Sequence, residues 1–143
     1  MAAIDHKFPI RASSRDVYAA ITTPEGLDAW WTLKSEGEPE EGSNYRFFFA
    51  PEYDWSGRVL SAVRDSLIEW EFTSAEPDWT GTILRMELEE KDGWTWVSFR
   101  HNKWAEANDH FRTSSYCWAS YLRLLKRFVE RGEVVEYSKR DEA

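Results

Sequence analysis

The feature that most constrains the fold is a long strand-like stretch with helical sequence on both sides. Residues 14–31 are typical of two short helices. Residues 108–132 carry apolar side chains at three- and four-residue spacing, which predicts one long amphipathic helix that ends at Gly132. A sheet bracketed in this way is expected to wrap around the last helix and to leave a cavity between the two.

The residues between the helices alternate between apolar and polar side chains, as strands with one buried face do. No helix-length connection separates successive runs, so we expect an antiparallel meander. The expected strands cover residues 4–11, before the helices, and then residues 44–50, 55–64, 67–73, 80–89 and 94–102. The fold class is therefore expected to be α+β, with a curved antiparallel sheet around a long C-terminal helix.

The length and the charge of the chain limit the number of domains and the classes of partner molecule. The 143 residues fit one domain, which we expect over residues 1–132, followed by a charged, frayed tail over residues 133–143. Acidic residues outnumber basic ones by 26 to 18, which argues against a nucleic-acid partner because such affinity depends on Lys and Arg. No run of 18 apolar residues and no signal-peptide pattern is present, so we expect a cytoplasmic protein without membrane insertion.

Metal and nucleophile chemistry find little support in the sequence. The single cysteine, Cys117, excludes an internal disulfide, and its place in an apolar helical stripe predicts a buried, inert thiol. The three histidines lack the spacing of a metal motif, so no metal and no other cofactor is expected. No nucleophile elbow surrounds Ser114 or Ser115, and no catalytic residue is assigned.

The order of elements resembles the START-like or SRPBCC superfamily, which has the helix-grip fold. Several segments resemble one branch of it, proteins related to activators of the heat-shock-protein ATPase. These segments are residues 17–20, 23–25, 30–31, 57–59 and 68–72, together with His101, Trp118, Tyr121, Leu122, Leu125 and Lys126. Eukaryotic co-chaperones of this group carry a separate N-terminal domain that contacts the chaperone, and no segment here corresponds to it. The resemblance therefore implies the helix-grip fold. It supports a chaperone contact only weakly, because the segment that makes this contact in the co-chaperones has no counterpart here.

The inner sheet face and the inner stripe of the last helix are expected to line the cavity. The candidate ligand-binding residues are Phe47, Phe49, Trp70, Phe72, Leu84, Met86, Phe99, His101, Ser115, Trp118 and Tyr121. A mostly apolar set with a few polar groups is typical of small-molecule pockets. The same pattern also fits a filled core, and both interpretations stay open.

Three functions remain as hypotheses. The first is binding of a small hydrophobic or aromatic molecule, with His101, Tyr121 or Ser115 fixing its orientation. The second is a protein-interaction module with an aromatic surface. A surplus of tryptophan also suggests a homodimer. The tryptophans concerned are Trp55, Trp79, Trp94, Trp96 and Trp104. The third is a cofactor-free cyclase- or hydrolase-like enzyme that uses His101 as acid or base.

Overall fold

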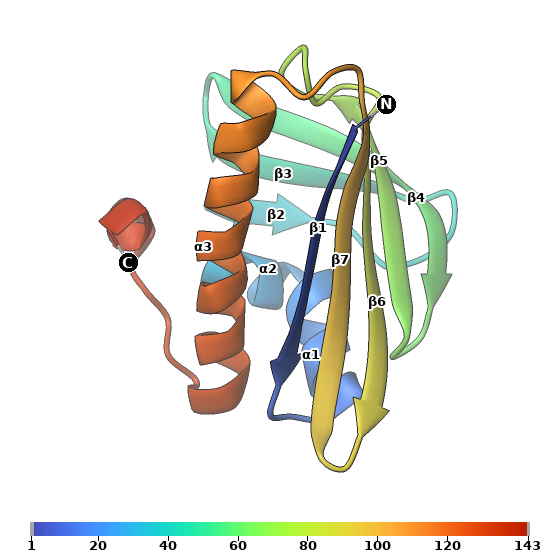
Figure 1. Cartoon of the computed structure of the whole chain (residues 1–143), viewed down its shortest axis with the longest axis vertical. Coiled ribbons are helices and arrows are strands. Elements are labelled where there is room, and N and C mark those ends of the chain that lie inside the picture. The colour runs from blue at the N-terminus through green and yellow to red at the C-terminus, as the bar shows by residue number, and fades with distance from the viewer. Residues whose placement is uncertain (1, 143) are drawn as a thin grey trace.

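Seven antiparallel strands form one continuous sheet that curves around the last helix. A computed structural model describes residues 2–142, and Figure 1 shows sheet and helix as two layers. The strand order is β1-β7-β6-β5-β4-β3-β2, so the first strand lies beside the last. The strands are β1 (Ala2–Ile10), β2 (Lys34–Glu36), β3 (Asn44–Ala50), β4 (Tyr53–Val63), β5 (Leu67–Ser74), β6 (Ile83–Lys91) and β7 (Trp94–Trp104). The α+β fold expected from the sequence is confirmed.

Three α-helices fill the inner side of the sheet. They are α1 (Ser14–Thr22), α2 (Pro24–Trp30) and α3 (Asp109–Arg131). A side-chain oxygen caps the start of each helix: Ser13, Thr23 and Asn108 each accept a backbone N–H three residues ahead. Gly132 ends α3 in the left-handed conformation, with φ of 68°, which glycine adopts without strain. Within residues 2–142, no helix is both long and apolar enough to cross a membrane.

Helices α1 and α2 pack closely because Gly26 lies between them. A Cβ atom at this position would lie 2.6 Å from the Cα atom of Ala20, which leaves no room for any other residue. The close contact lets the Trp30 indole N–H donate to the Ala20 carbonyl over 2.9 Å. The next residue, Trp31, then packs between sheet and last helix, with ring centroids 5.0 Å from Phe47 and 5.1 Å from Trp118.

The alternating inner residues of the sheet form the core. Fully buried aromatic and aliphatic side chains come from five strands: Ile10, Phe47, Ile68, Trp70, Phe72, Leu84, Met86 and Phe99. From the opposite layer, α3 contributes Leu122 and Leu125. The inner residues of the strands and the apolar stripe of α3 therefore pack into one core, as their spacing in the sequence predicts.

Two parts of the chain differ from the expectation. Residues Lys34–Glu36 form the short edge strand β2 against β3, a strand too short to show an alternating pattern. Residues 133–143 were expected to fray, and this prediction is wrong for the described part, because Tyr137–Glu142 form a 3₁₀ helix, η1. Figure 1 shows η1 beside α3, on the side away from β1.

Arg140 holds this tail against the end of α2. Its side chain is only 5 % exposed, and its guanidinium donates to the carbonyl oxygens of Asp28 at 2.7 Å, Thr32 at 3.2 Å and Val135 at 3.0 Å. The carbonyls of Asp28 and Thr32 belong to the C-terminal end of α2, where the helix itself supplies no partner. The charged tail is therefore an ordered part of the domain.

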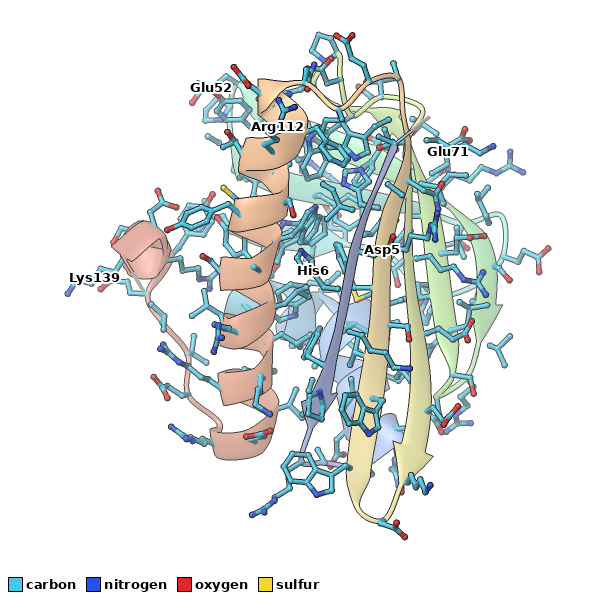
Figure 2. The ribbon with its side chains drawn as sticks, in the orientation of Figure 1. Asp5, His6, Glu52, Glu71, Arg112 and Lys139 are labelled. Atoms are coloured by element: carbon cyan, nitrogen blue, oxygen red, sulfur yellow. The ribbon has the colours of Figure 1, made fainter. Side chains whose placement is uncertain are left out.

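We expect Arg140→Met to destabilise the domain, because the substitution keeps the apolar stem and removes all five donors. The loss should be about 1–3 kcal/mol, the range for buried carbonyls left without a charged partner. Urea unfolding followed by tryptophan fluorescence measures it. Lys139→Met is the matched control, since Lys139 is 68 % exposed and points away from α3 (Figure 2). Equal stabilities of the two variants would contradict the anchoring role of Arg140.

Candidate functional site

A cavity of about 460 Å³ lies between strands β3 and β4 and the N-terminal half of α3. Most of its wall is aromatic. Seven lining residues are phenylalanine, tyrosine or tryptophan: Trp31, Phe49, Tyr53, Trp55, Trp79, Trp118 and Tyr121. The volume and the apolar lining are typical of a small-molecule pocket.

Five of these rings form a closed circuit, the aromatic girdle, made of Trp31, Phe49, Trp55, Trp79 and Trp118. Each ring contacts the next, with centroid separations of 5.5, 4.9, 4.8 and 5.7 Å along this order, and Trp118 lies 5.1 Å from Trp31. Such separations are in the favourable range for aromatic pairs. The girdle joins the end of α2, strands β3 and β4, the β5–β6 loop and α3, so distant segments of the chain define one pocket.

Polar groups lie among and beside the rings. The lining includes the side chains of Glu76, His110, Ser114 and Asp141. His110 is held between two carboxylates, with Nδ1 2.9 Å from Asp78 and Nε2 3.4 Å from Glu76. Within residues 2–142, neither lysine nor arginine lines this cavity, and no cluster of three His, Cys, Asp or Glu side chains is arranged to hold a metal ion.

His101 lies beneath the girdle at the centre of a hydrogen-bond chain. The Trp118 indole N–H donates to His101 Nδ1 over 3.2 Å, so Nε2 carries the proton and donates to Thr82 Oγ1 over 2.7 Å. The Thr82 hydroxyl then donates to the backbone carbonyl of Trp79. The Trp79 indole N–H donates to Ser114 Oγ over 3.3 Å. These bonds fix the orientation of two girdle tryptophans.

The same environment keeps His101 neutral. Burial, with a smaller contribution from His110, lowers the pKa of His101 to about 3. Both ring nitrogens have partners, and the described chain of bonds runs to a hydroxyl and a carbonyl rather than to a carboxylate. His101 therefore positions the Trp118 indole ring, and its geometry favours this role over proton transfer.

The structure divides the candidate residues between the pocket and the core. Phe49, Trp118 and Tyr121 line the cavity. Seven others are fully buried in the core below it: Phe47, Trp70, Phe72, Leu84, Met86, Phe99 and His101. Ser115 is half-buried on α3 outside the lining, and the buried residue next to it, Ser114, lines the cavity instead.

Sequence reasoning did not assign four of the aromatic residues to the pocket: Trp31, Tyr53, Trp55 and Trp79. They lie at a helix end, at a strand start or in a loop, where the sequence has no periodic pattern to place them. The surplus of tryptophan was the available sign that aromatic residues line a pocket. The prediction of a buried Cys117 is wrong, because the residue is exposed and lines the cavity. Partial burial of the thiol against the cavity wall, and then the carboxylate of Asp141, raise the pKa of Cys117, so the thiol stays protonated at neutral pH.

A second cleft, of about 360 Å³, lies between β1 and α3, where Figure 2 places His6. Its lining includes Phe8, Leu122, Arg123 and Lys126. The ammonium of Lys126 already binds the Pro9 carbonyl at 2.6 Å and Glu130 at 2.7 Å. This cleft has neither a girdle of rings nor a bonded polar network beneath it, so the aromatic pocket is the stronger candidate site.

Residues 11–130 match the family described as Activator of Hsp90 ATPase homolog 1-like protein. The chain belongs to this family. The resemblance noted in the sequence and the helix-grip fold are thereby confirmed. No protein with curated annotation matches the chain.

Solved structures of similar proteins agree with this assignment. The Aha1 dimer from Colwellia psychrerythraea is 31 % identical, with a TM-score of 0.84 over 93 % of this chain and 99 % of that one. Protein SSP2350 from Staphylococcus saprophyticus is 18 % identical, with a TM-score of 0.78 over 94 % and 96 % of the two chains. CalU16 from Micromonospora echinospora is 19 % identical, with a TM-score of 0.77 over 98 % and 84 %. The latter two share the fold.

The buried neutral His101 makes the stability of the domain depend on pH. Its pKa is about 3 in the folded chain and ordinarily 6.5, so the unfolded chain takes up a proton that the folded chain excludes. This contribution to stability is complete above pH 6.5 and is lost as the pH falls toward 3, by about 1.4 kcal/mol per pH unit.

The imidazole ¹⁵N shifts of His101, followed by NMR during acid titration, measure this directly. We expect the Nε2-protonated neutral form to persist well below the ordinary pKa of histidine until the domain unfolds. A reversible titration of His101 near 6.5 in the folded protein would contradict the neutral network.

Proposed function

We propose that this domain binds a small, largely apolar molecule with an aromatic group inside the aromatic girdle. The circuit of five contacting rings in the lining of an open cavity is the observation that carries the proposal. A planar ligand there would replace water at the ring faces and bury apolar surface on several sides. Such burial contributes about 25 cal/mol per Å² of apolar area.

The pocket is preorganised for such a ligand. Hydrogen bonds from the Trp79 and Trp118 indoles already fix two walls, so little side-chain freedom is lost on binding. Two polar groups remain to orient a ligand. The Ser114 oxygen accepts from Trp79, which leaves its O–H free to donate. Burial, followed by the nearby Asp141, raises the pKa of Tyr121 to about 12, so its phenol also stays a donor.

The enzyme hypothesis receives less support from the same residues. A general acid or base must reach the substrate, whereas both nitrogens of His101 are engaged below the girdle. The described hydrogen-bond partners of His101 are the Trp118 indole and the Thr82 hydroxyl, and these bonds orient the rings. Ligand binding therefore accounts for the geometry of the pocket and needs no catalytic group in contact with a substrate.

N-phenyl-1-naphthylamine, a neutral fluorescent probe, tests the proposed function. We expect saturable binding with quenching of tryptophan fluorescence, because girdle tryptophans would contact the probe. Tyr121→Ala should weaken binding about tenfold, since it removes one wall of the pocket.

Tyr116→Ala is the matched control, a tyrosine on the same helix with 76 % of its surface exposed. It should leave the affinity unchanged. Absence of saturable binding, or equal losses in both variants, would reject the girdle as the site.

We also propose that the chain forms a homodimer. The supporting observation is the Colwellia relative, described as a dimer, which is 31 % identical and aligns over 99 % of its length. Within residues 2–142, Trp96 is the tryptophan with more than a third of its surface exposed, at 40 %, while Trp79 and Trp104 are buried. The surplus of tryptophan therefore contributes mainly to the pocket and the core, and the relative carries the dimer proposal.

Sedimentation equilibrium at tens of micromolar should give twice the chain mass of 16.9 kDa. A single-chain mass throughout that range would reject the dimer. The family description also names an activator of the Hsp90 ATPase. A chaperone contact stays a prediction for this chain, and the ATP hydrolysis rate of Hsp90 with and without the protein measures it.

A further inference from the structure

We propose that the ligand of the aromatic girdle is an organic cation, an amine or quaternary ammonium group attached to an apolar or aromatic body. This inference rests on the proposed ligand-binding function and adds the charge of the ligand. Two features of the pocket support it independently: its aromatic lining, and the sign of the charges in that lining.

The girdle rings line the cavity, and most neighbouring pairs are inclined to one another, whereas Trp79 and Trp118 are stacked at 23°. Neighbouring rings meet at 64° for Trp31 and Phe49, 60° for Phe49 and Trp55, and 43° for Trp55 and Trp79. Ring faces carry negative quadrupole charge and attract a cation placed within about 6 Å of the centroid. A lining with seven aromatic residues provides several such rings for one ammonium group. An ammonium group gains from every face, whereas an anion is repelled by them.

The charged side chains of the pocket are acidic. Glu76 and Asp141 both belong to the lining, and no lysine or arginine of residues 2–142 joins them. Arg112, on the first turn of α3, pairs with Asp109 at 3.2 Å and lies outside the lining. His110 faces the two carboxylates Glu76 and Asp78, which already surround it. An anionic ligand would meet the carboxylates of Glu76 and Asp141 and, within residues 2–142, no lysine or arginine in the lining.

Asp141 is the carboxylate best placed to meet the ligand. It makes no ion pair within the described residues, and the neighbouring Arg140 is committed to backbone carbonyls. Its negative charge also acts on the pocket: after burial, Asp141 is the next cause of the raised pKa values of Tyr121 and Cys117. The anchored tail therefore holds a carboxylate at the pocket that a cation can neutralise. The net charge of −8 adds long-range attraction for cations.

Three probes of equal body and different charge test the inference: phenyltrimethylammonium, its neutral isostere tert-butylbenzene, and the anion benzenesulfonate. Each is measured by displacement of bound N-phenyl-1-naphthylamine. We expect the cation to bind at least about fivefold more tightly than the neutral isostere, and the anion to bind most weakly. Raising the salt from about 20 to about 300 mM should weaken the cation alone.

Variants that remove a carboxylate charge test which residues attract the cationic probe. Asp141→Asn and Glu76→Gln should each weaken the cation about threefold and leave the neutral probes unchanged, because only the charge is lost. Asp92→Asn is the matched control, an exposed carboxylate in the β6–β7 turn with the same change in net charge. It should leave all affinities unchanged.

The outcomes separate this inference from the proposed function. If N-phenyl-1-naphthylamine binds but the cation binds no better than tert-butylbenzene, the cation assignment is overturned and apolar binding stands. Cation binding that is insensitive to both pocket variants also overturns it. If N-phenyl-1-naphthylamine itself does not bind, the proposed function and the inference fail together.

Discussion

The hydrogen-bond chain through the buried, neutral His101 is the interaction on which the rest of the site depends. It links β7 to α3 through the Trp118 indole and to the β5–β6 loop through Thr82 and the Trp79 carbonyl. An indole N–H buried without a partner costs free energy, and histidine supplies an acceptor on one side while keeping a donor on the other. His101 fixes the Trp118 indole and Ser114 fixes the Trp79 indole, and both rings belong to the lining of the cavity.

The heavy aromatic content of the chain is explained by two connected structures. Phe47, Trp70 and Phe72 form a buried layer on the inner sheet face, and the girdle lies on top of it. Phe72 contacts Trp79 with centroids 5.2 Å apart, and Phe47 contacts Trp31 at 5.0 Å. Rings of the core therefore contact rings of the pocket directly, and the outer sheet face carries charged residues such as Glu71 (Figure 2). Membership in the Activator of Hsp90 ATPase homolog 1-like family accounts for the fold.

Local periodicity predicted the frame of the molecule well and the pocket only in part. The alternating run at Asn44–Ala50 has the bounds that its pattern predicts, and α3 agrees within one residue. Ser114 and Ser115 could not be separated, because neighbouring positions on one helical stripe differ by a rotation that tertiary packing decides. Trp79 and Arg140 lie in a loop and in the tail, where no repeat indicates burial. Their places depend on partners far away in sequence, Ser114 and the carbonyls of Asp28 and Thr32, which one sequence does not reveal.

The indole N–H signals of the nine tryptophans test the central claim most directly, that the girdle is an open binding site. In ¹H–¹⁵N spectra, titration with N-phenyl-1-naphthylamine should shift the signals of Trp31, Trp55, Trp79 and Trp118 along one saturable curve. The signals of Trp94 and Trp96, at the opposite end of β7 from His101, should stay in place. Shifts confined to Trp96, or no saturable shift at any girdle tryptophan, would contradict the account.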